Sequence, residues 1–187
     1  MKIVHGRTQV LRSPEYPNGG WVLVRVRTES GSEGLGECFV PDSQGRGVFA
    51  AREVIEGRLA RVVLGEDVRH TERIWERMYE VCGAIYDRRG LAIHAVSGVD
   101  MAVHDAAARA LQVPLHVLLG GCFRERVRVY VSSLWVDAVR PEPALEATAR
   151  YVAEGFTAIP SWPALRWWSR QGTPGCRRSR GWASSWT

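Results

Sequence analysis

The chain changes character at residue 160, and this change limits the material from which a folded core can be built. Up to Ile159, strand-like and helix-like runs alternate with an ordinary balance of charges. Residues 160–187, called the tail below, hold five of the eight Trp residues and no acidic residue. An ordinary soluble segment of this length contains about three acidic residues. We therefore expect residues 1–159 to supply one domain and the start of a second.

The charge distribution argues against a nucleic-acid partner. The formal net charge is +5, but five Arg residues of the tail account for it, and residues 1–159 carry 20 basic and 20 acidic side chains. Aromatic rings among arginines can bind single-stranded nucleic acid, so a binding arm in the tail remains an alternative. The neutral body offers such an arm no docking surface. We therefore expect no nucleic acid as partner.

Residue usage also excludes several classes of site. Lys2 is the only lysine, so no internal lysine is available as a base. The four cysteines are far apart and form no Cys-x-x-Cys motif, which favours reduced thiols in the core or on the surface. No charged leader and no apolar run of about 18 residues is seen, so a cytoplasmic protein without a membrane partner is expected.

The first 40 residues have the period of two that is typical of strands. Residues 2–11 and 20–30 are both strand-like, and in the second run Val22, Val24 and Val26 alternate with charged residues. Residues 12–20, RSPEYPNGG, are predicted to be a loop because of their Pro, Gly and Asn content. A turn at residues 31–34 then leads to a third strand. The pattern predicts a three-stranded antiparallel meander.

Three helical segments follow the predicted strands, at residues 48–64, 70–82 and 91–111. Apolar residues recur in them every three or four positions. The third is rich in Ala on a face suited to close packing, and we expect Pro114 to end it because proline cannot continue a helix. A short turn at residues 115–121 completes the predicted helical bundle.

After the bundle the order becomes strand, helix, strand. Residues 126–133 are strand-like, residues 141–155 have a helical pattern, and residues 156–159 begin another apolar strand. This βαβ order predicts the start of a parallel sheet. The expected domains are residues 1–125, residues 126–159 and the tail.

Three stretches make the chain similar to a known family. They are VRVRTESGSEGLGEC, GLAIHAVSGVDMAVHDAAARALQVPLHVLLGG and VRVYVSS, and they resemble, in this order, the mandelate racemase and muconate lactonizing branch of the enolase superfamily. His104 stands where relatives commonly have Trp. The resemblance implies an α+β capping domain at residues 1–125, with a three-stranded antiparallel meander and a helical bundle. The first β/α units of an incomplete (β/α)₈ barrel are expected to follow.

The resemblance also implies a chemistry and shows what this chain lacks for it. In this branch, Lys-x-Lys ends the second barrel strand, three carboxylates hold Mg²⁺, and a His or Lys is the opposite base for removing the proton α to a carboxylate. Pro160 stands where the first lysine is expected. We therefore name no catalytic and no metal residue and expect no Mg²⁺ on this chain. The intact parent is expected to be a dehydratase, racemase or cycloisomerase of a carboxylate, with a sugar acid as substrate.

The tail is interpreted as non-native and disordered, the product of out-of-frame translation of GC-rich DNA. Read in another frame, with synonymous codons chosen freely, Pro160-Ser161 contains a lysine codon directly after Ile159. The final ASSWT then contains Val-Val-Val-Asp, an apolar strand ending in a carboxylate. No second lysine appears two positions later. The chain is thus expected to be an inactive N-terminal fragment of its parent.

One loop keeps a functional role under this interpretation. In relatives, the loop between the first two strands of the cap closes over the barrel mouth, and here Glu15, Tyr16 and Asn18 are the polar side chains able to reach a substrate. Residues 40–47 form its companion. An ordinary hairpin loop is the alternative interpretation, left open here. Asp100 with His104, and His104 with Asp105, are candidates for a metal or acid-base pair, but at helical spacing in an Ala-rich bundle these residues are interpreted as packing and capping residues.

A different class of function also remains open. The capping domain alone could be a free-standing interaction module that dimerises through the exposed faces of its bundle. This alternative requires the capping domain to fold without its barrel. Under it, the chain would form a homo-oligomer.

Overall fold

The protein is described by a computed structural model that covers residues 1–13, 16–41, 47–83, 90–131 and 142–157. Contacts divide the chain into two units, Met1–Phe123 and Arg124–Thr187, and each is treated by itself. The tail lies outside the described residues, so the out-of-frame interpretation stays a prediction.

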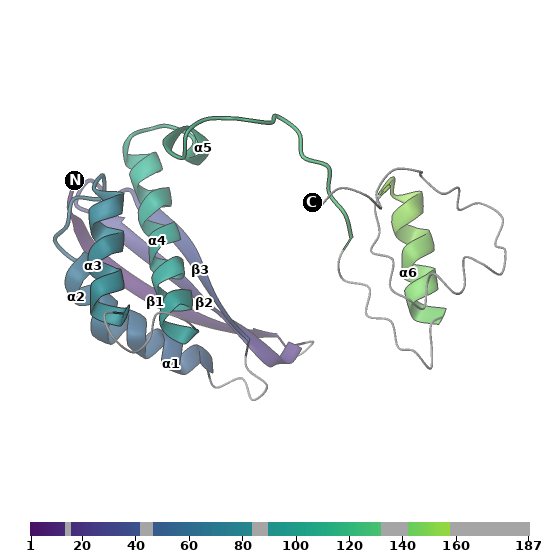
Figure 1. Ribbon diagram of the computed structural model, residues 1–187, viewed down its shortest axis with the longest axis horizontal. Coiled ribbons are helices and arrows are strands. Elements are labelled where there is room, and N and C mark those ends of the chain that lie inside the picture. Colours follow the sequence, from purple (N-terminus) through teal and green to yellow (C-terminus); the bar gives the residue numbers. More distant parts are fainter. Residues whose placement is uncertain (14–15, 42–46, 84–89, 132–141, 158–187) are drawn as a thin grey trace, which may run out of the picture. The chain divides into compact units, whose positions relative to one another are not determined.

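The first unit is a two-layer structure with a three-stranded sheet on one side and helices on the other (Figure 1). The strands are β1 (Ile3–Ser13), β2 (Tyr16–Thr28) and β3 (Glu33–Pro41), antiparallel and in the order β1-β2-β3. Val22, Val24 and Val26 are buried on the face that meets the helices. The predicted meander is confirmed, because the period of two places one valine row on one face.

The prediction of a loop over residues 12–20 was wrong. β1 continues to Ser13, β2 already begins at Tyr16, and these two residues face each other in the ladder. The register shifts between Leu11 and Ser13. Pro17 therefore lies in an irregular stretch of the sheet, where its missing N–H group is tolerated. The Pro, Gly and Asn residues of this segment therefore indicate irregular pairing between β1 and β2, and they do not indicate where the strands end.

The helices of the first unit occur where the apolar period predicts them. Residues 47–63 form one continuous run in which a turn of π-helix separates two α-helices. The run and the remaining helices comprise α1 (Gly47–Val54), η1 (Ile55–Leu59), α2 (Ala60–Val63), α3 (Thr71–Gly83), α4 (Leu91–Ala110) and α5 (Leu115–Leu118).

The end of α4 differs from the prediction that Pro114 stops this helix. Gln112 adopts a φ of +57°, and the Val113 N–H donates to the Ala108 carbonyl at 3.0 Å. The Gln112 N–H donates to the Arg109 carbonyl at 3.1 Å. These bonds form a Schellman cap, which satisfies the last carbonyls of the helix before the proline is reached. Pro114 instead precedes α5.

α4 approaches β3 so closely that side chains are excluded from the contact. A Cβ atom at Gly36 would lie 2.0 Å from the Gly98 carbonyl oxygen, and one at Gly34 would lie 2.0 Å from the Ala102 oxygen. A Cβ atom at Gly98 would lie 2.8 Å from the Cβ atom of Cys38. These distances are shorter than any allowed contact, so glycine is required at all three positions.

The cysteines of the described residues are free, as predicted. Cys38 and Cys82 are buried, whereas Cys122 is exposed; Cys176 lies outside the described residues. Burial raises the pKa of the Cys38 thiol to about 11, and the charge of Glu37 acts in the same direction. This thiol therefore stays neutral and behaves as a small apolar core residue.

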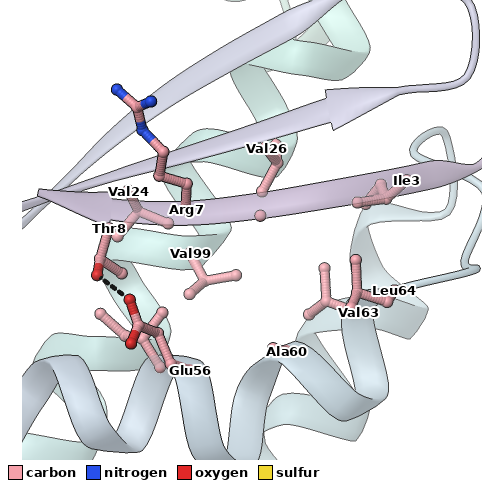
Figure 2. A pocket seen from close by; sticks show the side chains of 12 residues that line it. Ile3, Arg7, Thr8, Val24, Val26, Glu56, Ala60, Val63, Leu64 and Val99 are labelled. Carbon is pink, nitrogen blue, oxygen red and sulfur yellow. Dashed lines mark hydrogen bonds between the residues drawn. The ribbon is translucent and has the colours of Figure 1, made fainter.

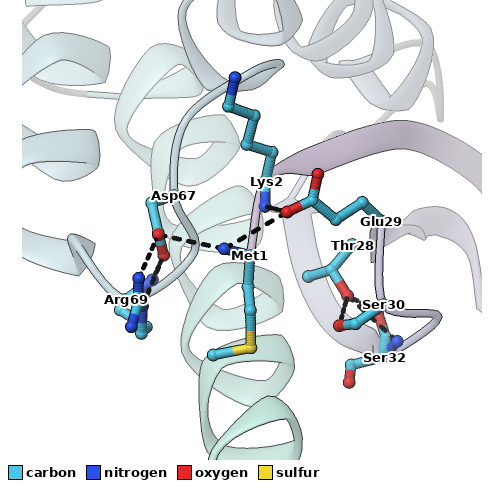
Figure 3. A network of polar contacts seen from close by, with 8 residues as sticks. All are labelled: Met1, Lys2, Thr28, Glu29, Ser30, Ser32, Asp67 and Arg69. Carbon is cyan, nitrogen blue, oxygen red and sulfur yellow. Dashed lines mark hydrogen bonds and ion pairs between the residues drawn. The ribbon is translucent and has the colours of Figure 1, made fainter.

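A polar network connects the start of β1 to the segment after α2 (Figure 3). The Met1 ammonium donates to Asp67 at 3.1 Å, and the Lys2 N–H donates to Glu29 at 3.0 Å. The Arg69 side chain donates to both Asp67 oxygens, at 2.9 and 2.6 Å, and holds the pKa of that carboxyl well below its usual range. The network fixes β1 against the neighbouring loop.

The second unit contains the predicted helix as α6 (Glu142–Ala153). Gly155 follows it at a φ of +94°, and the Phe156 N–H donates to the Tyr151 carbonyl at 3.0 Å, which again closes the helix.

The predicted strand at residues 126–133 does not form in its described part, residues 126–131. Val127 and Val129 are 72% and 61% exposed. A parallel strand needs neighbours to accept and donate its backbone hydrogen bonds, and no described residue supplies them. Residues 156–157 are not a strand either, and residues 158–159 lie outside the described residues.

Gly36→Ala should destabilise the first unit by about 2–4 kcal/mol, because the added methyl group must push α4 away from β3. The matched control is Gly6→Ala in β1, where the nearest atom to an added Cβ is 3.9 Å away. The control should be neutral or more stable by up to about 1 kcal/mol. Urea unfolding followed by circular dichroism measures both changes. Equal effects of the two substitutions would contradict the close-packing argument.

Candidate functional site

The two connections that the sequence singles out leave the sheet at the same end. Ser13 faces Tyr16 at the turn between β1 and β2, and Gly19 faces Pro41 at the last pair of β2 and β3. The connection from β3 to α1 therefore starts beside the connection from β1 to β2 (Figure 1). We call this region, residues 13–20 and 39–47, the hairpin end. It brings together the two segments for which a substrate role is predicted.

The three predicted substrate residues are placed only in part. Glu15 lies outside the described residues. Tyr16 and Asn18 belong to β2, and their backbone is described but their side chains are not. Residues 42–46 of the companion segment also lie outside the described residues. The structure thus supports the shared location of the two segments, and the contacts of these side chains stay predictions.

An aromatic pair lies at the base of the hairpin end. Trp21 and Phe39 are cross-strand partners, with ring centroids 6.1 Å apart and planes at 45°. Leu11 faces Trp21 from the other side, so the three form one row on the solvent face of the sheet. Such cross-strand aromatic contacts stabilise a sheet locally. Sequence reasoning missed this row, although Trp21 is adjacent to the buried Val22 and the period of two therefore places it on the opposite, solvent face.

The hairpin end is also held by its contact with α1. Gly20 is buried, and a Cβ atom built on it would lie 2.7 Å from Cγ1 of Val48. Val48 itself is fully buried in the main core. The Val48 side chain of α1 therefore packs directly on the backbone of β2 at Gly20, and the two connections start from a packed base. This arrangement is suited to presenting loops to a ligand.

A small apolar cavity lies between β1 and the helices (Figure 2). Its volume is about 40 Å³, enough for little more than one water molecule. At its rim the Thr8 hydroxyl donates to the Glu56 carboxylate. The cavity is too small for an organic substrate, so we assign it no binding role.

A larger cleft of about 770 Å³ lies beside α3 and α4. Asp100, His104, Asp105 and Glu72 are its acid-base groups, and Trp75 contributes an aromatic wall. Asp100, His104 and Asp105 belong to α4 and are the residues for which the sequence predicts packing and capping roles over an acid-base pair, whereas Glu72 belongs to α3. The hydrogen bonds of Asp105 and His104 show whether these side chains are arranged for acid-base chemistry or for stabilising the fold.

The contacts of Asp105 are structural. Its Oδ2 atom accepts a hydrogen bond from the Leu35 N–H at 2.9 Å, and its Oδ1 atom accepts one from Arg109 at 3.0 Å. Asp105 therefore fixes the start of β3 on α4 and has no hydrogen bond to His104 among the described residues. This agrees with the predicted packing and capping role.

His104 interacts with Asp100, one helical turn earlier. Its Nδ1 atom donates to the Asp100 carbonyl at 3.0 Å and lies 3.4 Å from the Asp100 carboxylate. The Asp100 side chain raises the pKa of His104, against burial, which lowers it, and the negative charge of Glu72 adds to the rise. The pair is a local ion pair within one helix. Within the described ranges, no third group forms a hydrogen bond with His104 that would orient the pair for acid-base catalysis.

The described residues do not form a metal centre or a membrane span. No group of three or more His, Cys, Asp or Glu side chains in the described ranges is close enough to hold a metal ion. The donor set required for Mg²⁺ is thus not present there, and we derive no step through a metal. Among the same residues, no helix combines the length and the apolar character needed to cross a bilayer.

Solved structures share the fold of this chain. A racemase from Streptomyces coelicolor A3(2) with bound magnesium matches with a TM-score of 0.72 and 30% identity, over 84% of this chain and 45% of that one. A putative galactarate dehydratase from Agrobacterium radiobacter, bound to Na and L-malate, matches with a TM-score of 0.69 and 29% identity, over 85% and 38% of the two chains.

Curated relatives are similar in sequence. The D-xylonate dehydratase of Haloferax volcanii is 35% identical over 145 residues, which are 77% of this chain and 32% of that protein. The D-galactonate dehydratase of Verminephrobacter eiseniae is 34% identical over 137 residues, or 73% and 33% of the two chains. This chain thus spans about a third of the length of the curated relatives it matches.

The match to a family model is confined to the first unit. The model of the mandelate racemase / muconate lactonizing enzyme N-terminal domain matches residues 16–120, from the start of β2 to the end of the α5 turn. The match covers more than half of the chain and agrees with the meander, the helices and the close α4–β3 contact. The chain therefore belongs to the mandelate racemase / muconate lactonizing enzyme family.

Proposed function

We propose that this chain is the capping portion of a Mg²⁺-dependent dehydratase that acts on a hydroxylated sugar acid. The observation that carries the proposal is the similarity over the cap to dehydratases named for D-xylonate and D-galactonate. Both names describe polyhydroxylated carboxylates, which agrees with the substrate class expected from the sequence. The metal and the chemistry belong to the barrel of the intact parent.

In this proposal the cap contributes substrate recognition. The hairpin end offers two adjacent connections on a packed base formed by the Gly20–Val48 contact and the Trp21–Phe39 pair. Glu15, Tyr16 and Asn18 would contact the end of the substrate far from the reacting carbon. A sugar acid carries hydroxyl groups at that end, and hydroxyl, amide and carboxylate side chains are suitable hydrogen-bond partners for them.

The 187-residue chain by itself is proposed to be inactive. Removal of a proton α to a carboxylate needs a base and a cation that neutralises the developing charge. Lys2 is the only lysine of the sequence, and the described residues hold no metal-binding group. We keep out-of-frame translation as the proposed origin of the tail.

The Asp100–His104 pair is proposed to stabilise α4 and to take no part in catalysis. Both side chains belong to one helix, at the spacing that favours an ion pair between neighbouring turns. The pair lies in the α3–α4 cleft and not at the hairpin end. Its contribution should therefore appear in stability and not in substrate affinity.

The purified 187-residue chain should not convert D-xylonate or D-galactonate in the presence of Mg²⁺. A parent chain with the barrel restored from the coding DNA should release a 2-keto acid at least about 10³-fold faster, because it regains the groups that stabilise the transition state. A colorimetric 2-keto acid assay measures both rates. Turnover by the 187-residue chain at a rate near that of the parent would refute its inactivity.

In the restored parent, Tyr16→Phe and Asn18→Ala should each raise KM about 5–10-fold, since each removes a hydrogen bond to the substrate. kcat should change little, because the contact is far from the reacting carbon. Gln9→Ala, an exposed residue of β1, is the matched control and should leave both constants unchanged. Unchanged KM in both test variants would remove the substrate role from the hairpin end.

Asp100→Asn should lower the pKa of His104 and destabilise the first unit in acid more than in base. The pKa of His104 is raised in the folded state, so its stabilisation is full below the unfolded value of about 6.5 and is lost as pH rises through the folded value. The Tm difference between the two proteins should be larger at pH 5.5 than at pH 8.5. NMR titration of the His104 ring measures the shift directly. An unchanged midpoint would contradict the assignment.

A further inference from the structure

The solvent face of the sheet carries a group of positive side chains that the proposed function does not use. Arg7 on β1 faces Arg25 on β2, and His5 on β1 faces Arg27 on β2. On the other side, Arg27 faces Glu33 of β3. These five residues surround a hollow of about 250 Å³. We call them the arginine face.

The arginine face brings like charges together on neighbouring strands. Like charges directly opposite each other destabilise an antiparallel pair. Among the described residues, no ion pair is found for Arg7, Arg25 or Arg27, in contrast to Arg52, Arg69, Arg73, Arg77 and Arg109, which all have acidic partners. Glu33 is the one acidic side chain lining the hollow, so the three guanidinium groups leave an excess of two positive charges.

One donor of this face has no partner in the described part of the chain. The Nε–H group of Arg25 is buried and donates to no acceptor among the described residues, although buried polar atoms normally have a partner. The strand register explains why Arg25 has no acceptor nearby. Arg25 stands between Arg7 and Leu35, neither of which offers a side-chain acceptor. An unpartnered charged donor costs free energy, and it adds to the unbalanced positive charge of this face.

The side chains point away from the core. Figure 2 shows Arg7 extending from β1 on the side opposite Glu56 and the helices. Thr8, the next residue, points toward the helices and bonds Glu56. The arginine face is therefore formed on the solvent side and is separate from the core and from the hairpin end, where the substrate segments lie.

We propose that the arginine face is a binding site for a small anion with two negative charges on oxygen, a phosphate or a dicarboxylate. Guanidinium groups recognise such oxyanions through paired N–H donors, and the excess of two positive charges fits a dianion. His5 adds a ring N–H donor at the edge of the hollow. The hollow of about 250 Å³ has room for a ligand of this size.

The test is ligand-dependent stability of the full chain. At constant ionic strength, 20 mM phosphate in place of chloride should raise Tm by about 3 °C, as expected for a ligand that binds only the folded state. Malonate in place of phosphate tests the dicarboxylate arm. Saturable binding of phosphate or of malonate supports the proposal. The anion that binds more tightly identifies the class of ligand.

Two variants with the same change of charge make the test specific. Arg25→Gln should weaken binding at least about tenfold, whereas Arg61→Gln on α2, an exposed arginine away from the face, should leave it unchanged. If Arg25→Gln does not fold, Arg7→Gln gives the same readout from an exposed position. Equal loss in the test and control variants, or a Tm rise that follows ionic strength alone, would overturn the proposal.

Discussion

The backbone contact between α4 and β3 is the interaction on which the rest of the first unit depends. Gly34 and Gly36 bring the strand to within contact distance of the helix, and Gly98 does the same from the helix side. This approach lets the long α4 cover the middle of the sheet, so that β2 and β3 share one buried face with it. Dispersion and apolar burial then act over a continuous core that extends from Ile3 to Ala107.

Much of this fold follows from residue periodicity. The alternating valines of β2 predict a half-buried strand, and the spacing in residues 70–82 and 91–111 predicts the two helices that cover it. Two other predictions were wrong for one shared reason. Pro17 suggested a loop, and the apolar residues 126–133 suggested a strand, but whether a segment belongs to a sheet is decided by its neighbours. The ladder tolerates Pro17, whereas residues 126–131 have no described neighbour to pair with.

The candidate sites show the same division between local and long-range information. The sequence identifies the loop residues at the hairpin end and the alternation of Arg25 and Arg27 with the buried valines. It does not show that Arg7 faces Arg25, because the register of β1 against β2 depends on the irregularity between Leu11 and Ser13, next to the turn. Nor does it show that Asp105 bonds Leu35, 70 residues away in the chain. Such contacts exist only once the whole unit has folded.

The junction of β2 and α1 at Gly20 and Val48 has a consequence for the evolution of this family. The junction closes the core just before the two connections begin, so substitutions in the connections need not disturb the packed interior. Under the proposed function, stability and ligand preference depend on different stretches of sequence. A lineage could lengthen, shorten or recode residues 14–15 and 42–46 while it inherits the same scaffold. The scaffold thus tolerates changes in its connections without a folding defect.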